Sequence, residues 1–214
     1  MSKKAITDRR RTLIFINILI SCIASSMLST ALTTALLPMT ESLNISVSTG
    51  QWLTSGYSLV MGIIMPLTAF MITRFPTRRL YLSGIGVFIV GLVISACAFN
   101  FPMMMAGRVL QASGNGILMS MAQVVLLTIY PPEKRGTVMG WYGLASGAAP
   151  VIAPTIAGVL VDTIGWRSIF YIVLGVMMIS FVFAICVFDD VLDTRKKKFD
   201  IVSFALSIFA FGGR

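Results

Sequence analysis

Six long apolar runs divide the sequence, and they constrain the fold more than any other feature. Each contains about 20 residues or more, the length that an α-helix needs to cross about 30 Å of hydrocarbon. The runs are Leu13–Leu37, Trp52–Ile72, Leu80–Phe99, Met103–Ile129, Val138–Val161 and Ile169–Phe188. The sequence therefore predicts an all-α membrane protein with six transmembrane helices. We expect the lipid bilayer to be one of its partners.

A seventh apolar run begins at Ile201 and stops at Gly213, which is too short to cross a bilayer as a helix. We interpret it as the start of a truncated seventh transmembrane helix. The predicted organisation is a cytoplasmic N-terminal tail at 1–12, a six-helix transmembrane domain at 13–188, a cytoplasmic linker at 189–200 and the start of the seventh helix at 201–214.

Basic residues lie mostly on one side of the predicted membrane. The net charge is +9, and Lys and Arg gather in the N-terminal tail, in the loops after the second and fourth runs, and after the sixth run. The opposite side carries only Arg167. Because cytoplasmic loops carry an excess of Lys and Arg, we predict a multi-pass protein of the cell membrane with a cytoplasmic N-terminus. This scattered distribution argues against a nucleic-acid partner, which would need a continuous basic surface.

Residues that perform catalysis or bind metals are scarce in this sequence. It contains no histidine, so histidine-based zinc sites and Ser-His catalytic pairs are excluded. The three cysteines, Cys22, Cys97 and Cys186, each lie inside an apolar run and form no CxxC pair. We predict no catalytic residue, no metal and no cofactor, and an enzyme embedded in the membrane is the weakest interpretation.

Arg108 lies inside the fourth apolar run, although a charge at the bilayer centre costs roughly 2.5–3.5 kcal/mol on insertion scales. On a helix, Gln111, Asn115 and Gln123 fall within about 60° of Arg108. Arg108 by itself could snorkel to the outer interface, but Gln111 and Asn115 lie too deep to do so. We therefore predict that this polar face meets protein or a wet cavity and that Arg108 belongs to a buried network.

A weak internal repeat links the two halves of the six-helix region. TRFPTRRLY at Thr73–Tyr81 aligns with DTIGWRSIF at Asp162–Phe170, which places Arg78 opposite Arg167. Each segment follows the second run of a three-run unit, and the two lie on opposite sides of the membrane. This pattern predicts an inverted 3+3 repeat, as in many transporters.

The fifth apolar run is rich in small residues and proline. Ala149, Ala153 and Ala157 form a line of small side chains along which another helix can approach closely. Pro150 and Pro154 each remove a backbone donor and bend a helix. Tight helix packing explains this composition, and an element that rocks against another would have the same one.

Several segments together resemble the N-terminal half of a major facilitator superfamily transporter, of the fourteen-span drug:proton antiporter type. Arg108, Gln111 and Gly114 match the RxxQGxG motif of the fourth span. The short linker before the next apolar run is also similar to fourteen-span members. The other matching segments are LSTALTTALLP at 28–38, QWLTSGYSL at 51–59, APVIAPTIAG at 149–158 and GWRSIFYI at 165–172.

The resemblance implies roles for individual residues. Arg108 would face a central cavity between two six-helix halves and assist coupling or hold an internal network. The residues implied for a substrate and coupling cavity are Arg108, Gln111, Asn115, Gln123 and Ser29. Those implied for a gating loop are Arg74, Arg78 and Arg79, and those for the antiporter motif of the fifth span are Pro150, Pro154 and Gly158.

The sequence also departs from the family pattern. Ser29 stands where the first-span motif has an acid, and Thr73 replaces the aspartate of the loop motif. None of the six runs contains an acidic residue, although proton-coupled export in this family is ascribed to membrane carboxylates. Any coupling acid is therefore expected in a C-terminal half that this chain lacks.

These observations predict a secondary active transporter that exports drugs or other small amphiphilic molecules in exchange for protons, as part of a longer protein. The alternative is a truncated or non-transporting fragment. The sequence does not identify the substrate.

Overall fold

The computed structural model describes residues 8–188, and all regular structure in this range is helical. The helices are α1 (Asp8–Thr34), α2 (Leu36–Ser42), α3 (Val47–Arg74), α4 (Thr77–Ala96), α5 (Phe101–Ile129), α6 (Pro132–Thr163) and α7 (Arg167–Val187). All except the short α2 are long and apolar enough to cross a membrane. The predicted all-α fold with six membrane-spanning helices is therefore confirmed.

The helices extend beyond the apolar runs at several ends. α1 begins at Asp8, inside the segment predicted as a tail, and α6 begins at Pro132, six positions before its apolar run. Charged residues are compatible with a helix that continues into the interface, and Arg11 bonds Asp8 at 3.0 Å on the first turn of α1. The predicted linker at 189–200 and the start of a seventh helix at 201–214 lie outside the described residues.

Local sequence signals set several helix boundaries. The Ser46 hydroxyl accepts the backbone N–H of Thr49 at 3.1 Å and caps α3. The side chain of Asn100 caps α5 in the same way, through the N–H of Met103 at 2.9 Å. Gly165 has φ +99°, a conformation that favours glycine, and it turns the chain from α6 into α7.

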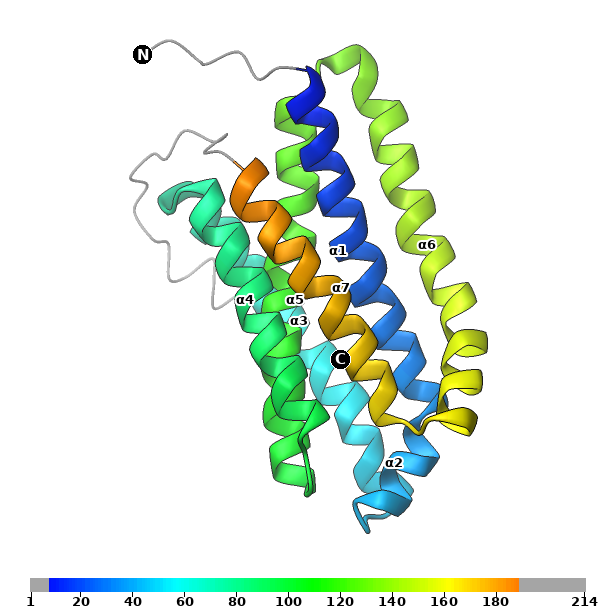
Figure 1. The fold of residues 1–214 in the computed structure, drawn as a ribbon. Coiled ribbons are helices and arrows are strands. Elements are labelled where there is room, and N and C mark those ends of the chain that lie inside the picture. The colour runs from blue at the N-terminus through cyan, green and yellow to red at the C-terminus, as the bar shows by residue number, and fades with distance from the viewer. Residues whose placement is uncertain (1–7, 189–214) are drawn as a thin grey trace.

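The packing of the helices is symmetric when the two three-helix units are exchanged. The first unit is α1, α3 and α4, and the second is α5, α6 and α7. α5 packs against α3 and α4, α1 packs against α6 and α7, and α4 packs against α7. Exchanging α1 with α5, α3 with α6 and α4 with α7 reproduces this pattern, which is what an inverted repeat predicts (Figure 1).

Two arginines bond α4 and α7 to each other reciprocally. Arg78, in the first turn of α4, donates to the carbonyl of Ile185 in the last turn of α7 at 2.7 Å. Arg167, at the start of α7, donates to the carbonyl of Ala98, just beyond the end of α4, at 2.8 Å. A cation at a helix C-terminus satisfies a carbonyl and complements the helix dipole. The two arginines that the sequence repeat aligned therefore hold equivalent positions at opposite ends of this pair.

Glycine allows α4 and α5 to approach each other very closely. A Cβ atom added at Gly114 would lie 2.6 Å from the carbonyl oxygen of Gly84 and 2.7 Å from the backbone nitrogen of Phe88. A Cβ at Gly91 would lie 2.7 Å from the backbone nitrogen of Gln111. Backbone atoms cannot move aside as a flexible side chain can, so small residues are required here, as in other membrane helix pairs.

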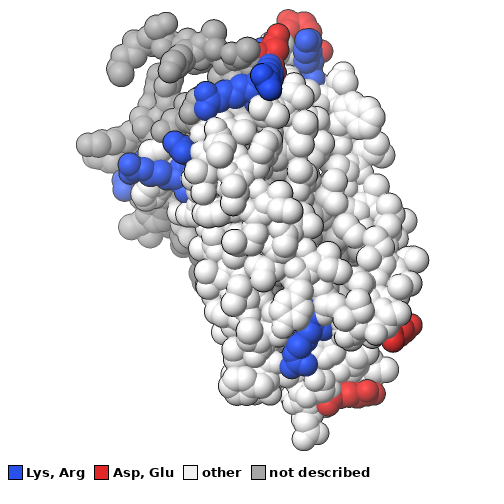
Figure 2. Space-filling view, in the orientation of Figure 1, with Lys and Arg blue, Asp and Glu red and all other residues white. Residues whose placement is uncertain are grey.

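The charged side chains gather at the two ends of the bundle. Figure 2 shows most of the basic residues near the end where α1 begins, a broad uncharged band, and a few charges at the other end. The residues at that other end are Arg167, Glu41 and Asp162. The uncharged band has the character of a surface that contacts hydrocarbon.

The first prediction concerns the contact between α4 and α5. Gly114→Ala should destabilise the fold by at least about 1–3 kcal/mol, because the methyl group would overlap backbone atoms of α4. Gly86→Ala is the matched control: a Cβ at Gly86 meets nothing within 4 Å, and alanine is the better helix former by about 0.5–1 kcal/mol. Thermal unfolding in detergent measures both changes, and equal stability of the two variants would contradict the close approach.

Candidate functional site

Arg108 is enclosed by the bundle, and only 1% of its surface is exposed. Its Nε donates to the carbonyl of Leu53 on α3 at 3.2 Å, and its Nη1 donates to Oε1 of Gln111 at 2.8 Å. The guanidinium lies over the ring of Tyr57, with 4.0 Å between Cζ and the ring centroid. The snorkelling alternative is therefore wrong, and the prediction of a buried network is confirmed.

Gln111 connects this arginine to α4. Its Nε2 donates to the carbonyl of Gly91 at 3.0 Å and to the hydroxyl of Ser95 at 2.8 Å, while its oxygen accepts from Arg108. The small residues at the α4–α5 contact make this reach possible. Gln111 thus fixes the orientation of Arg108 relative to two neighbouring helices.

Asn115 adds the next turn of α5 to the same cluster. Its Nδ2 donates to the hydroxyl of Tyr57 at 2.7 Å and lies 3.5 Å from the sulfur of Met61. Its Oδ1 is buried and has no hydrogen-bond partner among residues 8–188. We call Arg108, Gln111, Asn115, Tyr57 and Ser95 the arginine cluster.

The charge of Arg108 is balanced without an acid among the described residues. The acids in residues 8–188 lie near helix ends: Asp8, Glu41, Glu133 and Asp162. Arg108 relies instead on a carbonyl, an amide oxygen and an aromatic face. Removing any one of these neutral partners should strongly destabilise the fold, because the buried charge of Arg108 cannot return to water.

A second buried polar cluster, which the sequence analysis missed, joins α1 to α4 and α7. Nδ2 of Asn17 donates to the backbone carbonyl of Ser180 at 2.9 Å and to its hydroxyl at 3.0 Å. The Tyr81 hydroxyl donates to Oδ1 of Asn17 at 3.0 Å, and the hydroxyls of Ser21 and Ser180 lie 2.8 Å apart. We call Asn17, Ser21, Tyr81 and Ser180 the asparagine cluster. The signal available in the sequence was Asn17 inside the first apolar run.

The two clusters are related by the inverted repeat. In each cluster, an amide side chain lies on the first helix of one unit. Its N–H groups donate hydrogen bonds to a backbone carbonyl and to a serine hydroxyl on the third helix of the other unit. Gln111 on α5 does this with Gly91 and Ser95 on α4, and Asn17 on α1 does it with Ser180 on α7. The clusters fasten the two units to each other at two depths.

Other predicted site residues lie apart from the arginine cluster. Gln123 is exposed, because the polar face of α5 drifts out of the bundle toward its C-terminal end, and Ser29 on α1 is half-buried. In the predicted gating loop, Arg74 and Arg79 are exposed and Arg78 caps α7. These side chains are therefore not brought into one site with Arg108, and their roles stay predictions.

α6 presents two different small-residue faces. Ala149, Ala153 and Ala157 are buried on the side that packs along α1. A Cβ at any of the glycines on the other side would meet nothing within 4 Å; these are Gly136, Gly140, Gly143, Gly147 and Gly158. Pro150 is half-buried and Pro154 is exposed. The alanine line thus packs within the described bundle, and no residue in 8–188 covers the glycine face.

No group of three or more metal-ligating side chains of the His, Cys, Asp and Glu types occurs in residues 8–188. The polar groups of the site are amides, hydroxyls and one guanidinium, buried between helices that span a membrane. This arrangement orients helices and holds charge, and it offers no nucleophile with a general base beside it.

The fold matches solved membrane transporters. A peptide transporter named POT aligns with 93% of this chain and 44% of its own length at a TM-score of 0.76, with 14% sequence identity. A bacterial homologue of the human lysosomal transporter Spinster aligns with 97% of this chain and 50% of its own length at a TM-score of 0.73, with 16% identity. The class of fold is therefore that of one half of a membrane transporter.

The sequence narrows this class to a family. The profile of the Major Facilitator Superfamily matches residues 14–210, and the chain belongs to that superfamily. An uncharacterized MFS-type transporter of Bacillus subtilis, YcnB, is 42% identical over 184 residues, which are 86% of this chain and 39% of the relative. The lincomycin resistance protein LmrB of the same organism is 38% identical over 200 residues, which are 94% of this chain and 42% of the relative. The chain thus spans about two fifths of the length of these relatives, which are named as transporters or resistance proteins and not as enzymes.

Proposed function

We propose that this chain forms the N-terminal half of a proton-coupled exporter of drugs or other small amphiphilic molecules, of the fourteen-span antiporter type. The resistance named in LmrB and the short linker before Ile201 support this assignment. The substrate would be an amphiphilic compound that enters from the bilayer or the adjacent water, and the site of action would be the cell membrane.

The observation that carries the proposal is that two spanning helices have faces unsuited to lipid. On α3, Gln51, Ser55 and Ser58 are exposed and lie on one side of the helix. On α6, the uncovered glycine face would let another helix approach closely. Hydrocarbon offers no hydrogen bonds to polar side chains or to exposed backbone. A second set of helices that packs against both faces would satisfy them better than lipid. That set would be the C-terminal half, with the substrate site between the halves.

The arginine cluster would serve this cycle from inside the half. Arg108, Gln111 and Asn115 connect α3, α4 and α5, so a change in their bonding would tilt these helices together. Ser29 and Gln123 would line the cavity on the exposed faces of α1 and α5. Protons would be carried by carboxylates outside the six apolar runs, since those runs contain none.

Two further elements would control opening and closing. Arg74, Arg78 and Arg79 would act as the gating loop, with Arg78 already holding the end of α7. Pro150, Pro154 and Gly158 would allow α6 to bend against the other half. The alternative is a fragment that does not transport, and the following experiment separates the two.

We expect export to require both halves. A chimera in which this chain replaces the matching segment of LmrB should export ethidium or lincomycin in an energy-dependent way, whereas the 214-residue chain by itself should not. Efflux from cells is measured at matched membrane abundance. An inactive chimera would favour the non-transporting alternative, and efflux by a chain that crosslinking shows to be monomeric would refute the need for a second half.

In the active chimera, Arg108→Lys should abolish most export while the protein still inserts. Arg108 bonds two acceptors on different helices through two separate nitrogens, and the compact ammonium of lysine cannot reproduce this planar fork. Arg167→Lys is the matched control: Arg167 also stacks on an aromatic ring, at 4.1 Å, but it bonds one carbonyl, which lysine can still reach. Arg108→Ala should be inactive as well, and normal efflux with Arg108→Lys would show that the cluster is dispensable.

We also propose that the end where α1 begins is cytoplasmic, from the distribution of basic residues. In a background without the three native cysteines, Ser48→Cys should react with an impermeant maleimide on intact cells, since Ser48 is exposed at the other end. Gly136→Cys, exposed at the basic end, should react only after the membrane is opened. The reverse pattern would invert the proposed orientation.

A further inference from the structure

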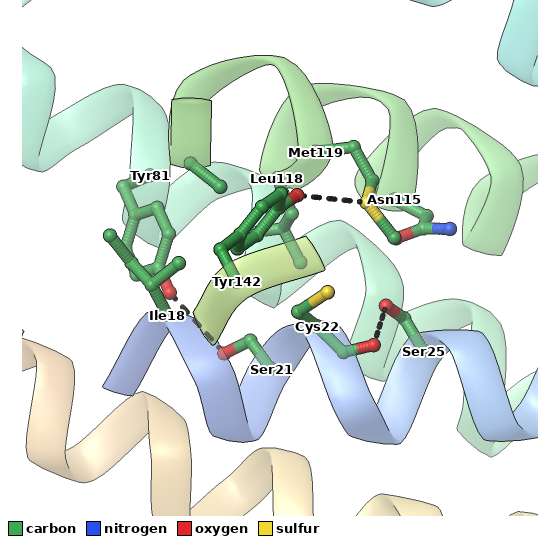
Figure 3. Close-up of a pocket in the computed structure, with 10 residues that line it drawn as sticks. Ile18, Ser21, Cys22, Ser25, Tyr81, Asn115, Leu118, Met119 and Tyr142 are labelled. Carbon is green, nitrogen blue, oxygen red and sulfur yellow. Dashed lines mark hydrogen bonds between the residues drawn. The ribbon is translucent and has the colours of Figure 1, made fainter. Parts of the chain in front are cut away.

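A small cavity of about 10 Å³ lies between the arginine cluster and the asparagine cluster. This volume is at the lower limit of the space that one buried water needs. Ser21 and Tyr81 of the asparagine cluster line it on one side and Asn115 of the arginine cluster on the other (Figure 3). The remaining lining residues are Ile18, Cys22, Ser25, Leu118, Met119, Ala122 and Tyr142.

Asn115 supplies the unsatisfied group at this cavity. Its Nδ2 is bonded to the Tyr57 hydroxyl on α3, and its Oδ1 is buried without a partner although the residue lines the cavity. Whichever atom of the amide faces Tyr57, the other atom of the same amide is left without a bond in the cluster. A buried amide atom without a partner costs roughly as much as a lost hydrogen bond, so native structures rarely keep one.

The other polar groups around the cavity retain hydrogen-bonding capacity. The Ser25 hydroxyl donates to the carbonyl of Cys22 at 3.1 Å, and the Tyr142 hydroxyl lies 3.3 Å from the sulfur of Met119. Each of these oxygens keeps lone pairs that can accept a hydrogen bond from a water molecule. Ser25 and Tyr142 therefore bring two further acceptors to residues that line the cavity, besides Oδ1 of Asn115.

We propose that this cavity holds one ordered water, which donates to Oδ1 of Asn115 and links this member of the arginine cluster to the asparagine cluster. On one side of the water the hydrogen bonds run through Asn115 to the Tyr57 hydroxyl on α3, whose ring lies under Arg108. On the other side they run through Ser21 and Tyr81 to Asn17 and Ser180 on α1 and α7. These bonds connect helices of both three-helix units near the middle of the bundle. This water site does not rest on the proposed transport function, because it depends only on how the helices of this chain pack.

Hydroxyl-radical footprinting with an X-ray beam tests the proposal on this chain in lipid nanodiscs. Radicals form from bound water and modify the side chains beside it, even where bulk solvent is absent. Cys22 and Tyr81 are 5% and 1% exposed and line the cavity, while Met104 and Met177 are 0% exposed and lie away from it. We expect Cys22 and Tyr81 to be modified several-fold faster than the two methionines. Equal, background rates at all four would overturn the water site.

A variant that fills the cavity provides the control. Ala122→Val places extra methyl groups in the space, and it should reduce modification of Cys22 and Tyr81 to the rate of Met104. Ser25→Val fills the same space from α1 and keeps the test available if the first variant does not fold by circular dichroism. Ala148→Val on α6, away from the cavity, should leave the labelling unchanged. Persistent labelling in a folded, filled variant would place the water elsewhere and refute the proposal.

Discussion

The organisation of this six-helix bundle depends on satisfying polar groups where water is scarce. Arg108 is fully charged and almost fully buried, so every neighbour that accepts a hydrogen bond from it is fixed in position. This requirement draws the backbone of α3 toward α5 and orients Gln111 toward α4. Because lipid cannot replace any of these partners, the three helices form a unit in which a change at one helix is transmitted to the others.

The inverted repeat places the same hydrogen-bonding arrangement in both three-helix units. Asn17 repeats on α1 what Gln111 does on α5, and Arg167 repeats on α7 what Arg78 does on α4. The paired arginines fasten α4 to α7 at both ends, while the two amides fasten the units at two depths within the membrane. The internal bonds of such a bundle resist deformation, while the faces of α3 and α6 are uncovered within residues 8–188.

The six helices and the burial of Arg108 could both be predicted from the sequence. Hydrocarbon thickness sets the minimum span length, so the six helices followed directly from the apolar runs. The depth of Gln111 and Asn115 also predicted that Arg108 would be buried, because neither amide can reach the interface. The asparagine cluster was harder to predict: Asn17 and Ser180 are 163 positions apart, and no local pattern relates them. Gln123 was assigned to the arginine face from helical periodicity, which does not reveal where a neighbouring helix stops covering that face.

The sequence by itself determined the class of fold, because this depends on composition and on the length of the apolar runs. The weak repeat of Arg78 and Arg167 only indicated the symmetry between the two units, which the packing of the helices then showed. The sequence also determined that small residues on α6 serve close packing, but not against what. Only the tertiary structure separated the alanine line, which packs on α1, from the glycine face, which is uncovered within residues 8–188. Only the tertiary structure decided which acceptors hold Arg108. The physical reason is that side-chain partners depend on helix rotation and separation, which are set by packing among elements distant in sequence.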